Sequence, residues 1–352
     1  MSTYVPFLKA KLGEMNAMSA LDPHIRAAIT PFFDFPRGKP DYTAETYEAA
    51  ARSIAKGLKA HWGTDRECYF DDFDVGQKFT VKGEPQYAFM LKALRDLKVI
   101  PVVGLARTSH NAAVAQLKQS GDLVSDTVAF RVEHDDFEDF KVKAKEIGDE
   151  LGAIFKKFKT IDLVLDCRLC SGMKAEETAP QIAAFVKQLA QAYNVRHVIV
   201  TGSSIPATIR DVVKSKTSEI VPRHELAIIT KARKLSAVPI TPGDYATVSP
   251  FYSDKQFKKE ILQKVTVPRL IYSFDHSHYI RRGASLDAGG HDQYFGMTNE
   301  LLAQKFFRKD YSFGEAYFAE KTKRIGNRAN NASVVKPSIV AHITYMVMGA
   351  KF

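Results

Sequence analysis

The sequence predicts an α/β protein built on a closed (β/α)8 barrel, and three observations support this. Short apolar runs alternate with longer stretches of helical spacing through the first 250 residues. The runs are apolar at consecutive positions, which indicates strands buried on both faces, as in parallel sheets covered by helices. Eight such runs in about 250 residues match a TIM-like barrel better than an open doubly wound sheet, which is the alternative.

The eight predicted strands are rich in β-branched and aromatic residues. They cover residues 3–10, 28–35, 67–73, 99–106, 127–133, 160–167, 195–202 and 237–248. The stretches between them carry apolar residues at helical spacing. They cover residues 13–21, 43–62, 84–98, 109–119, 139–158, 176–193 and 223–235. No G-x-G-x-x-G or Walker A sequence follows a strand, which mildly favours the barrel over the open sheet.

The alternation ends after residue 250. The stretch RLIYSFDHSHYIRRG, residues 269–283, predicts an antiparallel hairpin with a turn at DHSH, whose histidines we expect to be solvated. Helices are expected at 294–309 and 314–324, and either a helix or a strand at 338–349. Because no low-complexity linker precedes this region, we predict one composite domain: a barrel over 1–250 and an elaboration over 251–352 packed on it.

Composition describes a globular chain. With 352 residues and 45% hydrophobic content, it can bury a large core. It has no apolar run of membrane-spanning length and no secretion signal at the N-terminus, so we expect a cytosolic protein without a membrane span. Cys68, Cys167 and Cys170 are too few for a disulfide framework or a four-thiolate zinc site. We expect them to be structural.

The chain is basic, with a net charge of +10 and a pI near 9.3. From residue 301 onward, nine lysines and arginines face three acids. Such an excess suggests an anionic partner, namely a nucleotide, a nucleic acid or an acidic protein. A solvated basic face with no ligand is the simpler alternative.

Polar residues follow nearly every predicted strand, where the sites of this barrel fold are built. They are Asp34, Asp71, Asp72, Arg107, Arg131, Glu133, Asp166, Arg168, Gly202, Ser203, Asp244 and Tyr245. Side chains alternate along a strand, so Arg131 shares a face with Glu133, and Asp166 shares one with Arg168. A charge inside a barrel needs a partner, so these groups form either a ligand site or a purely structural network.

The residue types in this ring fit phosphate chemistry. Arg107, Arg131 and Arg168 present paired donors that suit phosphate or carboxylate, and the turn at Gly202 and Ser203 offers backbone N–H groups. The carboxylates suit a general base or an oxygen-liganded cation such as Mg²⁺ or Mn²⁺. The expected catalytic residues are Asp71, Asp72, Glu133, Asp166 and Asp244. Their spacing is not diagnostic of a metal, and the early strands lack the histidine of barrel phosphodiesterases.

Five stretches, in this order, resemble the Beta protein family of bacterial and phage genomes: YVPFLKAKLGE near the start, ITPFFDFP, GDYA, YIRRG and GNRA. The family pattern maps onto Tyr4, Pro6, Leu8, Lys9, Lys11, Gly13, Glu14, Asp244, Tyr245, Arg282, Gly283, Gly326 and Asn327. We expect Lys9, Lys11, Tyr245 and Arg282 to join the anion-binding groups. The chain departs from the pattern near its end, where His342 stands alone in place of paired histidines.

The resemblance brings no settled activity. It implies a role in phage–host conflict, because similar genes occur in mobile or defence-associated neighbourhoods. Two functions follow from the residues: a metal-dependent phosphodiesterase or nuclease-type enzyme, or a non-catalytic module that binds a nucleotide or nucleic acid and acts with a protein partner. A third reading is a scaffold whose barrel charges only pair with one another.

Overall fold

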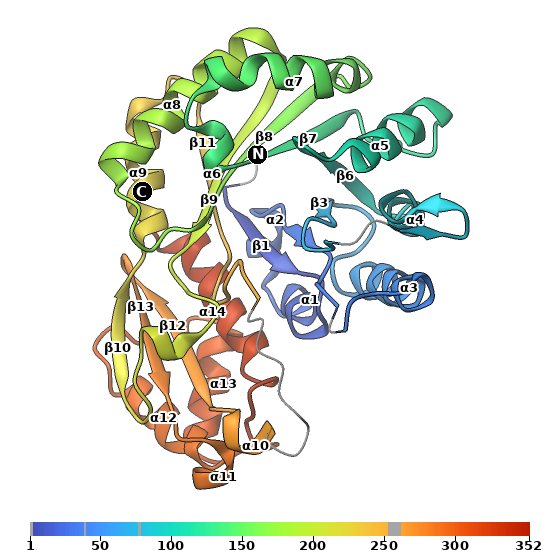
Figure 1. The fold of residues 1–352 in the computed structure, drawn as a ribbon. Coiled ribbons are helices and arrows are strands. Elements are labelled where there is room, and N and C mark those ends of the chain that lie inside the picture. The colour runs from blue at the N-terminus through green and yellow to red at the C-terminus, as the bar shows by residue number, and fades with distance from the viewer. Residues whose placement is uncertain (1–2, 39, 77–78, 253–261) are drawn as a thin grey trace.

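The computed structural model describes residues 3–38, 40–76, 79–252 and 262–352. A closed barrel of eight parallel strands forms its first part (Figure 1), which confirms the predicted fold class. Each barrel strand pairs with the next one along the chain, and β11 pairs with β1. The strands are β1 (Val5–Lys9), β2 (Phe32–Asp34), β3 (Glu67–Asp71), β6 (Lys98–Val103), β7 (Thr127–Glu133), β8 (Thr160–Leu169), β9 (Val195–Ser203) and β11 (Ile240–Asp244).

Helices of the first part follow the strands and cover the outside of the barrel. They are α1 (Leu12–Ser19), α2 (Pro23–Ala27), α3 (Ala44–His61), α4 (Gln86–Ala93), α5 (Thr108–Ser120), α6 (His134–Phe137), α7 (Phe140–Phe155), α8 (Ala175–Ala192) and α9 (His224–Leu235). A small hairpin of β4 (Thr80–Val81) and β5 (Glu84–Pro85) precedes α4. Helix α3 shows how the sequence determines such a helix. Thr43 forms a capping box at its N-terminus, and its buried stripe consists of Tyr47, Ala51, Ile54 and Leu58.

The C-terminal part is built on an antiparallel sheet in the order β10–β13–β12 (Figure 1). Its elements are β10 (Ser218–Pro222), α10 (Leu262–Val265), β12 (Arg269–Phe274), β13 (Ser277–Arg282), α11 (Leu286–Gly289), α12 (Gln293–Leu302), α13 (Phe313–Thr322) and α14 (Val335–Met348). The predicted hairpin at DHSH is present, and the last segment is a helix. Strand β10, which the sequence did not predict, comes from within the region assigned to the barrel, after the short 3₁₀ helix η1 (Ile209–Asp211).

Helix α14 joins the two parts. It packs against α13 and β12 on one side and against α1 and α2 of the barrel on the other. Its residues from Pro337 to Met346 are all buried, which fits a helix covered on several sides. The C-terminal part is therefore anchored on the barrel through its last helix.

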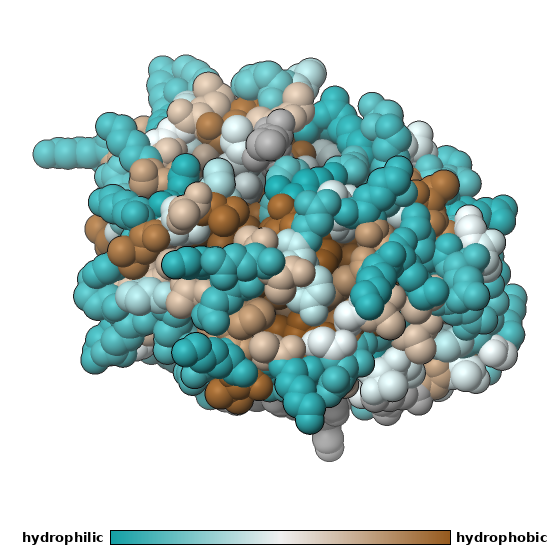
Figure 2. Space-filling view, turned by 90° about the horizontal axis from the view of Figure 1, so that it is seen from above, coloured by the Kyte–Doolittle hydropathy of each residue, from teal (hydrophilic) through white to brown (hydrophobic). Residues whose placement is uncertain are grey.

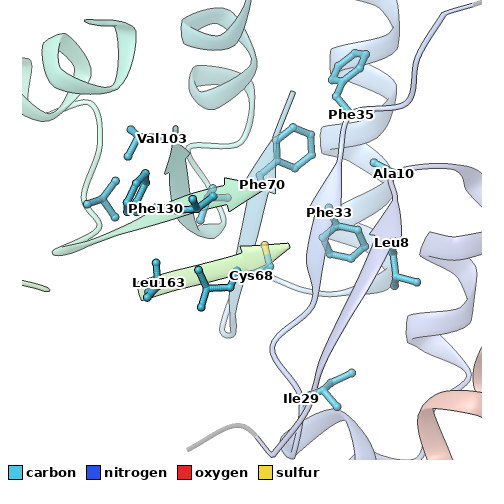
Figure 3. Close-up of a cluster of buried hydrophobic side chains, with 14 of the residues drawn as sticks. Leu8, Ala10, Ile29, Phe33, Phe35, Cys68, Phe70, Val103, Phe130 and Leu163 are labelled. Atoms are coloured by element: carbon cyan, nitrogen blue, oxygen red, sulfur yellow. The ribbon is translucent and has the colours of Figure 1, made fainter. Parts of the chain in front are cut away.

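Side-chain alternation separates two cores in the barrel. Outward residues such as Leu8, Phe33, Phe70 and Phe130 pack under the helices (Figure 3). Inward residues fill the barrel interior; these are Val5, Phe7, Phe32, Tyr69, Ile100, Val102, Ala129, Val164, Ile199 and Tyr245. The next inward positions toward the carboxyl ends of the strands are polar, so the apolar interior is the floor of the barrel mouth.

All three cysteines are free and buried. Burial raises the pKa of Cys68 to about 12, so its thiol stays protonated. Hydrophilic side chains cover most of the face seen in Figure 2, with hydrophobic ones visible between them. Among the described residues, none of the helices is long and apolar enough to cross a membrane.

Candidate functional site

Arg131 lies at the centre of the barrel mouth, pointing inward from β7 with a fully buried side chain. Its Nη1 donates to Asp34 at 2.7 Å and to Asp71 at 2.9 Å, and its Nη2 donates to Asp166 at 2.7 Å. The Tyr245 hydroxyl accepts from Nη2 at 2.9 Å and donates to Asp166 at 2.6 Å. Residues from β2, β3, β7 and β8, together with Tyr245 just after β11, thus form one charged layer.

The charged groups in this layer shift one another's pKa values. Burial opposes the charge of Arg131, but the carboxylates around it, Asp34 foremost, raise its pKa well above the ordinary value. Burial also opposes the charge of Asp71, yet Arg107 and Arg131 hold its pKa below the usual range. At Asp34 burial dominates and raises the pKa to about 6. The layer therefore places a carboxyl group that titrates near neutral pH beside one that stays ionised.

Three guanidinium groups surround the ring of Phe73, which follows β3. The Cζ atoms of Arg107, Arg131 and Arg168 lie 4.7, 4.6 and 4.7 Å from its centroid. Arg107 also makes a bidentate ion pair with Asp71, at 2.8 and 3.1 Å. Because the face of an aromatic ring attracts cations, Phe73 helps to hold three like charges together.

Arg168 enters the mouth through an irregularity in β8. The pairing with β9 shifts register after Asp166, and Arg168 has a left-handed backbone with φ 52°. Its guanidinium donates to Tyr245 at 3.2 Å and to Asp74 at 3.3 Å, and its Nε lies 3.5 Å from a Glu133 oxygen. Among the described residues, this buried Nε has no hydrogen-bond partner. Arg168 is therefore less fully bonded than Arg131.

Two cavities meet at Phe73. The first measures about 340 Å³, and its lining includes Asp72, Phe73, Tyr87, Arg107 and His110. The second measures about 630 Å³, and its lining includes Arg37, Tyr42, Phe73, Asp74, Arg168, Phe251 and Tyr252. Both volumes lie in the range of small-ligand sites. Aromatic rings and arginine side chains thus share the walls of the larger cavity.

Lys9 and Lys11 come together at Tyr252. Lys9 points inward from the end of β1, and its Nζ lies 3.2 Å from the Tyr252 ring centroid; Lys11 Nζ lies 4.9 Å from it. Burial lowers the pKa of Lys9 to about 8. Both lysines line a third cavity of about 590 Å³. Tyr252 lines both this cavity and the second one. The two lysines therefore lie beside the mouth.

Asp72 points outward from the end of β3, away from Arg131, and meets His110 on α5. His110 Nδ1 lies 2.8 Å from Asp72, and its Nε2 lies 2.7 Å from the Val102 carbonyl oxygen. Ligand atoms of Asp71, Asp72 and His110 come within 4.8 Å of one another. However, arginines already donate to both oxygens of Asp71, and both ring nitrogens of His110 are bonded. In this arrangement the cluster does not fit Mg²⁺ or Mn²⁺.

Asp244 lies outside the mouth, contrary to the expectation that it joins the catalytic carboxylates. Along β11 it alternates with the inward Tyr245 and so points outward, toward α14. It accepts from the Tyr4 hydroxyl and from Arg223 Nη2, each at 2.5 Å, and lies 2.9 Å from His342 Nε2. Burial opposes its charge, but His342 and Arg223 hold its pKa below the usual range. Asp244 is therefore part of a buried joint between barrel and C-terminal part.

The expectation that the DHSH histidines are solvated is wrong for His278, which is buried in the same joint. His342 Nδ1 lies 2.6 Å from the Ser273 hydroxyl, which is 3.0 Å from His278 Nδ1. His278 is buried, whereas His276 is exposed as expected. The reason is alternation along β13, which sends His278 toward α14.

Arg282 also lies away from the mouth, contrary to expectation. Its strand, β13, pairs with β10 and β12 and not with the barrel. Arg282 Nη1 donates to the Val213 carbonyl at 3.2 Å. Arg282 lines a cavity of about 470 Å³ on the C-terminal part, which shares no lining residue with the mouth cavities.

Gly202 and Ser203 do not form an open N–H turn. Ser203 still pairs with Leu169 on β8, and its hydroxyl donates to the Val248 carbonyl at 3.2 Å. Gly202 points out of the barrel, where an added Cβ would lie 2.3 Å from Cys170 Sγ. The glycine is therefore needed for close packing against Cys170, not for anion binding.

Gly202→Ala is expected to lower the free energy of unfolding by about 1–3 kcal/mol, because the new methyl group overpacks against Cys170. Urea unfolding followed by circular dichroism measures the loss. Gly148→Ala on α7 is the matched control: no atom lies within 4 Å of its Cβ position, so it should be neutral or slightly stabilising. Equal stability of the two variants would contradict the packing argument.

Several mouth residues were not predicted from the sequence: Arg37, Phe73, Asp74, His110, Phe251 and Tyr252. A signal existed for two of them, since Phe73 and Asp74 directly follow Asp71 and Asp72 in DDFD. The others lie in loops or at a helix start, where no periodicity reports side-chain direction.

A protein-family model described as Beta protein matches residues 4–348, nearly the whole chain. The chain belongs to the Beta protein family. None of the curated proteins compared with it matches. Of the residues of the Beta protein pattern, Lys9, Lys11 and Tyr245 lie at or beside the mouth, Tyr4 and Asp244 lie in the joint, and Arg282 lies on the C-terminal part. His342, which stands alone here, bonds to Asp244.

Proposed function

We propose that the barrel mouth binds a phosphorylated small molecule of the nucleotide class. The observation that carries the proposal is the 630 Å³ cavity, where Arg37 and Arg168 share the walls with Phe73, Phe251 and Tyr252. Guanidinium groups suit phosphate oxygens, and aromatic rings suit the face of a base. Arg37 and Arg168 supply the positive charge that an anion needs at this cavity.

Binding is favoured over metal-dependent hydrolysis. Each carboxylate of the central layer already accepts from Arg131, so a metal ion would have to displace a buried guanidinium. Glu133 supports enzymatic phosphodiester cleavage as the second candidate. Its side chain is 40% exposed beside Arg168, and its pKa is raised, chiefly by burial, which suits a general acid or base.

We propose a cytosolic protein that acts with a protein partner, and for its role we keep the phage–host conflict implied by family resemblance.

Arg168→Gln is expected to weaken nucleotide binding about tenfold or more, because it removes a charge-assisted contact worth ~1.5–3 kcal/mol. Arg168→Lys should recover only part of the loss, since it keeps the charge without the planar fork. A thermal-shift panel of nucleotides, with and without Mg²⁺, identifies the ligand; one at a hundred times its Kd adds about 2.7 kcal/mol. Titration calorimetry then gives the affinities.

Arg233→Gln is the matched control, because this exposed arginine also stacks on a phenylalanine, Phe352, but lies outside the mouth cavities. It should bind like the wild type. No stabilisation by any nucleotide would overturn the proposal. Turnover of a bound phosphodiester that Glu133→Gln abolishes would move the conclusion to the enzyme.

A further inference from the structure

The mouth is one end of a longer series of adjoining cavities. The second cavity shares Phe251 and Tyr252 with the third. The third shares Ala207, Ile209 and Arg269 with another cavity of about 470 Å³ on the C-terminal part. The cavities therefore adjoin one another along a path from the barrel mouth, past Lys9 and Lys11, to the loop before β12.

The chemistry changes along this path. At the mouth, aromatic rings accompany cations and acids alike, including Asp41 and Asp74. In the middle, Lys9, Lys11 and Arg269 outnumber the single acid, Glu14. At the far end, the cationic lining residues are Arg210, Lys264, Arg269 and Arg282, and the described lining contains no acid.

Among the described residues, three of the four far cations have no neutralising partner, whereas Arg210 lies 3.7 Å from Asp211. Lys264 and Arg269 are exposed, and no described carboxylate lies within ion-pairing distance of either one or of Arg282. Arg282 instead donates to a backbone carbonyl. Cations grouped in a concave surface repel one another unless an anion joins them, so this end is electrostatically complementary to a run of phosphates.

We propose that the series of cavities is a track for a single-stranded nucleic acid, with a nucleotide in the mouth and the following phosphates on the cations of the C-terminal part. This rests on the proposed nucleotide site and extends it. Single strands bind through stacking on aromatic rings combined with a basic groove, whereas the bases of a duplex already stack on one another. The mouth supplies the rings and the far end supplies the charge.

The test measures affinity against strand length. Fluorescent single strands of one, two, four and eight nucleotides are titrated by anisotropy at several salt concentrations. We expect affinity to rise at least tenfold from one nucleotide to eight. The variant Lys264→Gln with Arg269→Gln should lose most of that gain, flatten the salt dependence by ~0.7 per phosphate contact removed, and leave mononucleotide binding unchanged.

Lys323→Gln with Arg324→Gln is the matched control. It removes the same charge from exposed positions that line none of these cavities. An equal loss in the control would overturn the track, because the binding would then be non-specific. Unchanged affinity from one nucleotide to eight would overturn the track but not the mouth site. Failure of every length overturns both, and equal binding of duplex or polyphosphate overturns the single-strand assignment.

Discussion

Replacing Arg131 by methionine is expected to lower the free energy of unfolding by about 3–5 kcal/mol, because it leaves buried carboxylates without their shared cation. Asp34 and Asp166 lose the guanidinium that donates to them, while Asp71 keeps Arg107 and Asp166 keeps only the more distant Arg168, at 3.9 Å. Urea unfolding followed by circular dichroism measures the change. A loss of this size indicates a tightly coupled charged layer, whereas a solvated mouth predicts a much smaller loss.

Arg52→Met is the matched control, since Arg52 makes an exposed pair with Glu48 on α3. Such pairs contribute about 0–1 kcal/mol. If Arg131→Met fails to fold, Arg131→Lys is used instead, because it keeps the charge but loses the planar fork of the guanidinium. Its free energy of unfolding should lie between those of the wild type and Arg131→Met. A loss below about 1 kcal/mol for Arg131→Met would mean that the carboxylates are not dependent on Arg131.

Asp244→Ala is expected to lower the free energy of unfolding by about 3–5 kcal/mol, because it leaves the buried partners of Asp244 in the joint without their acceptor. Arg223 loses one of its two carboxylates, and Tyr4 and His342 lose an acceptor. The same unfolding experiment applies. Tyr4→Phe, which removes a single hydroxyl, should cost only ~1–3 kcal/mol.

The functional readout of Asp244→Ala is as informative as its stability. The side chain points away from the mouth, so folded protein carrying the change should bind nucleotide with unchanged affinity. The titration is made at a temperature where the variant is fully folded, with Asp211→Ala on the exposed surface as the control. Loss of binding by folded variant would return Asp244 to the functional residues and contradict its assignment to the joint.

Alternation explains why the central layer was predictable. In TVAFRVE and TIDLVLDC, counting by two predicts that Arg131 shares a face with Glu133 and that Asp166 shares one with Arg168. Asp34 and Asp71 were expected at the mouth because they end their predicted strands. The barrel itself follows from the repetition of such runs. Local sequence patterns therefore predicted both the barrel and the charged residues at the centre of its mouth.

The remaining errors have physical causes. Asp244 was expected at the mouth because it ends the run ITPGD, but the position at the end of a strand does not show to which face a side chain points. The placement of Arg282 depends on which sheet β13 joins, a long-range pairing that no local pattern reports. Strand β10, SEIVP, is short and largely exposed, so it resembles a loop in sequence. Arg168 was not such an error: it lies at the mouth as expected, although its left-handed backbone was not predicted.

The position of β10 has a consequence for synthesis on the ribosome. This strand is made between two barrel strands, but its partner β13 and the anchoring helix α14 are made much later. A nascent chain that has completed β11 therefore carries an unpaired strand edge and an uncovered outer face near Tyr4, both liabilities for aggregation. This face of the barrel stays uncovered until α14 has been translated.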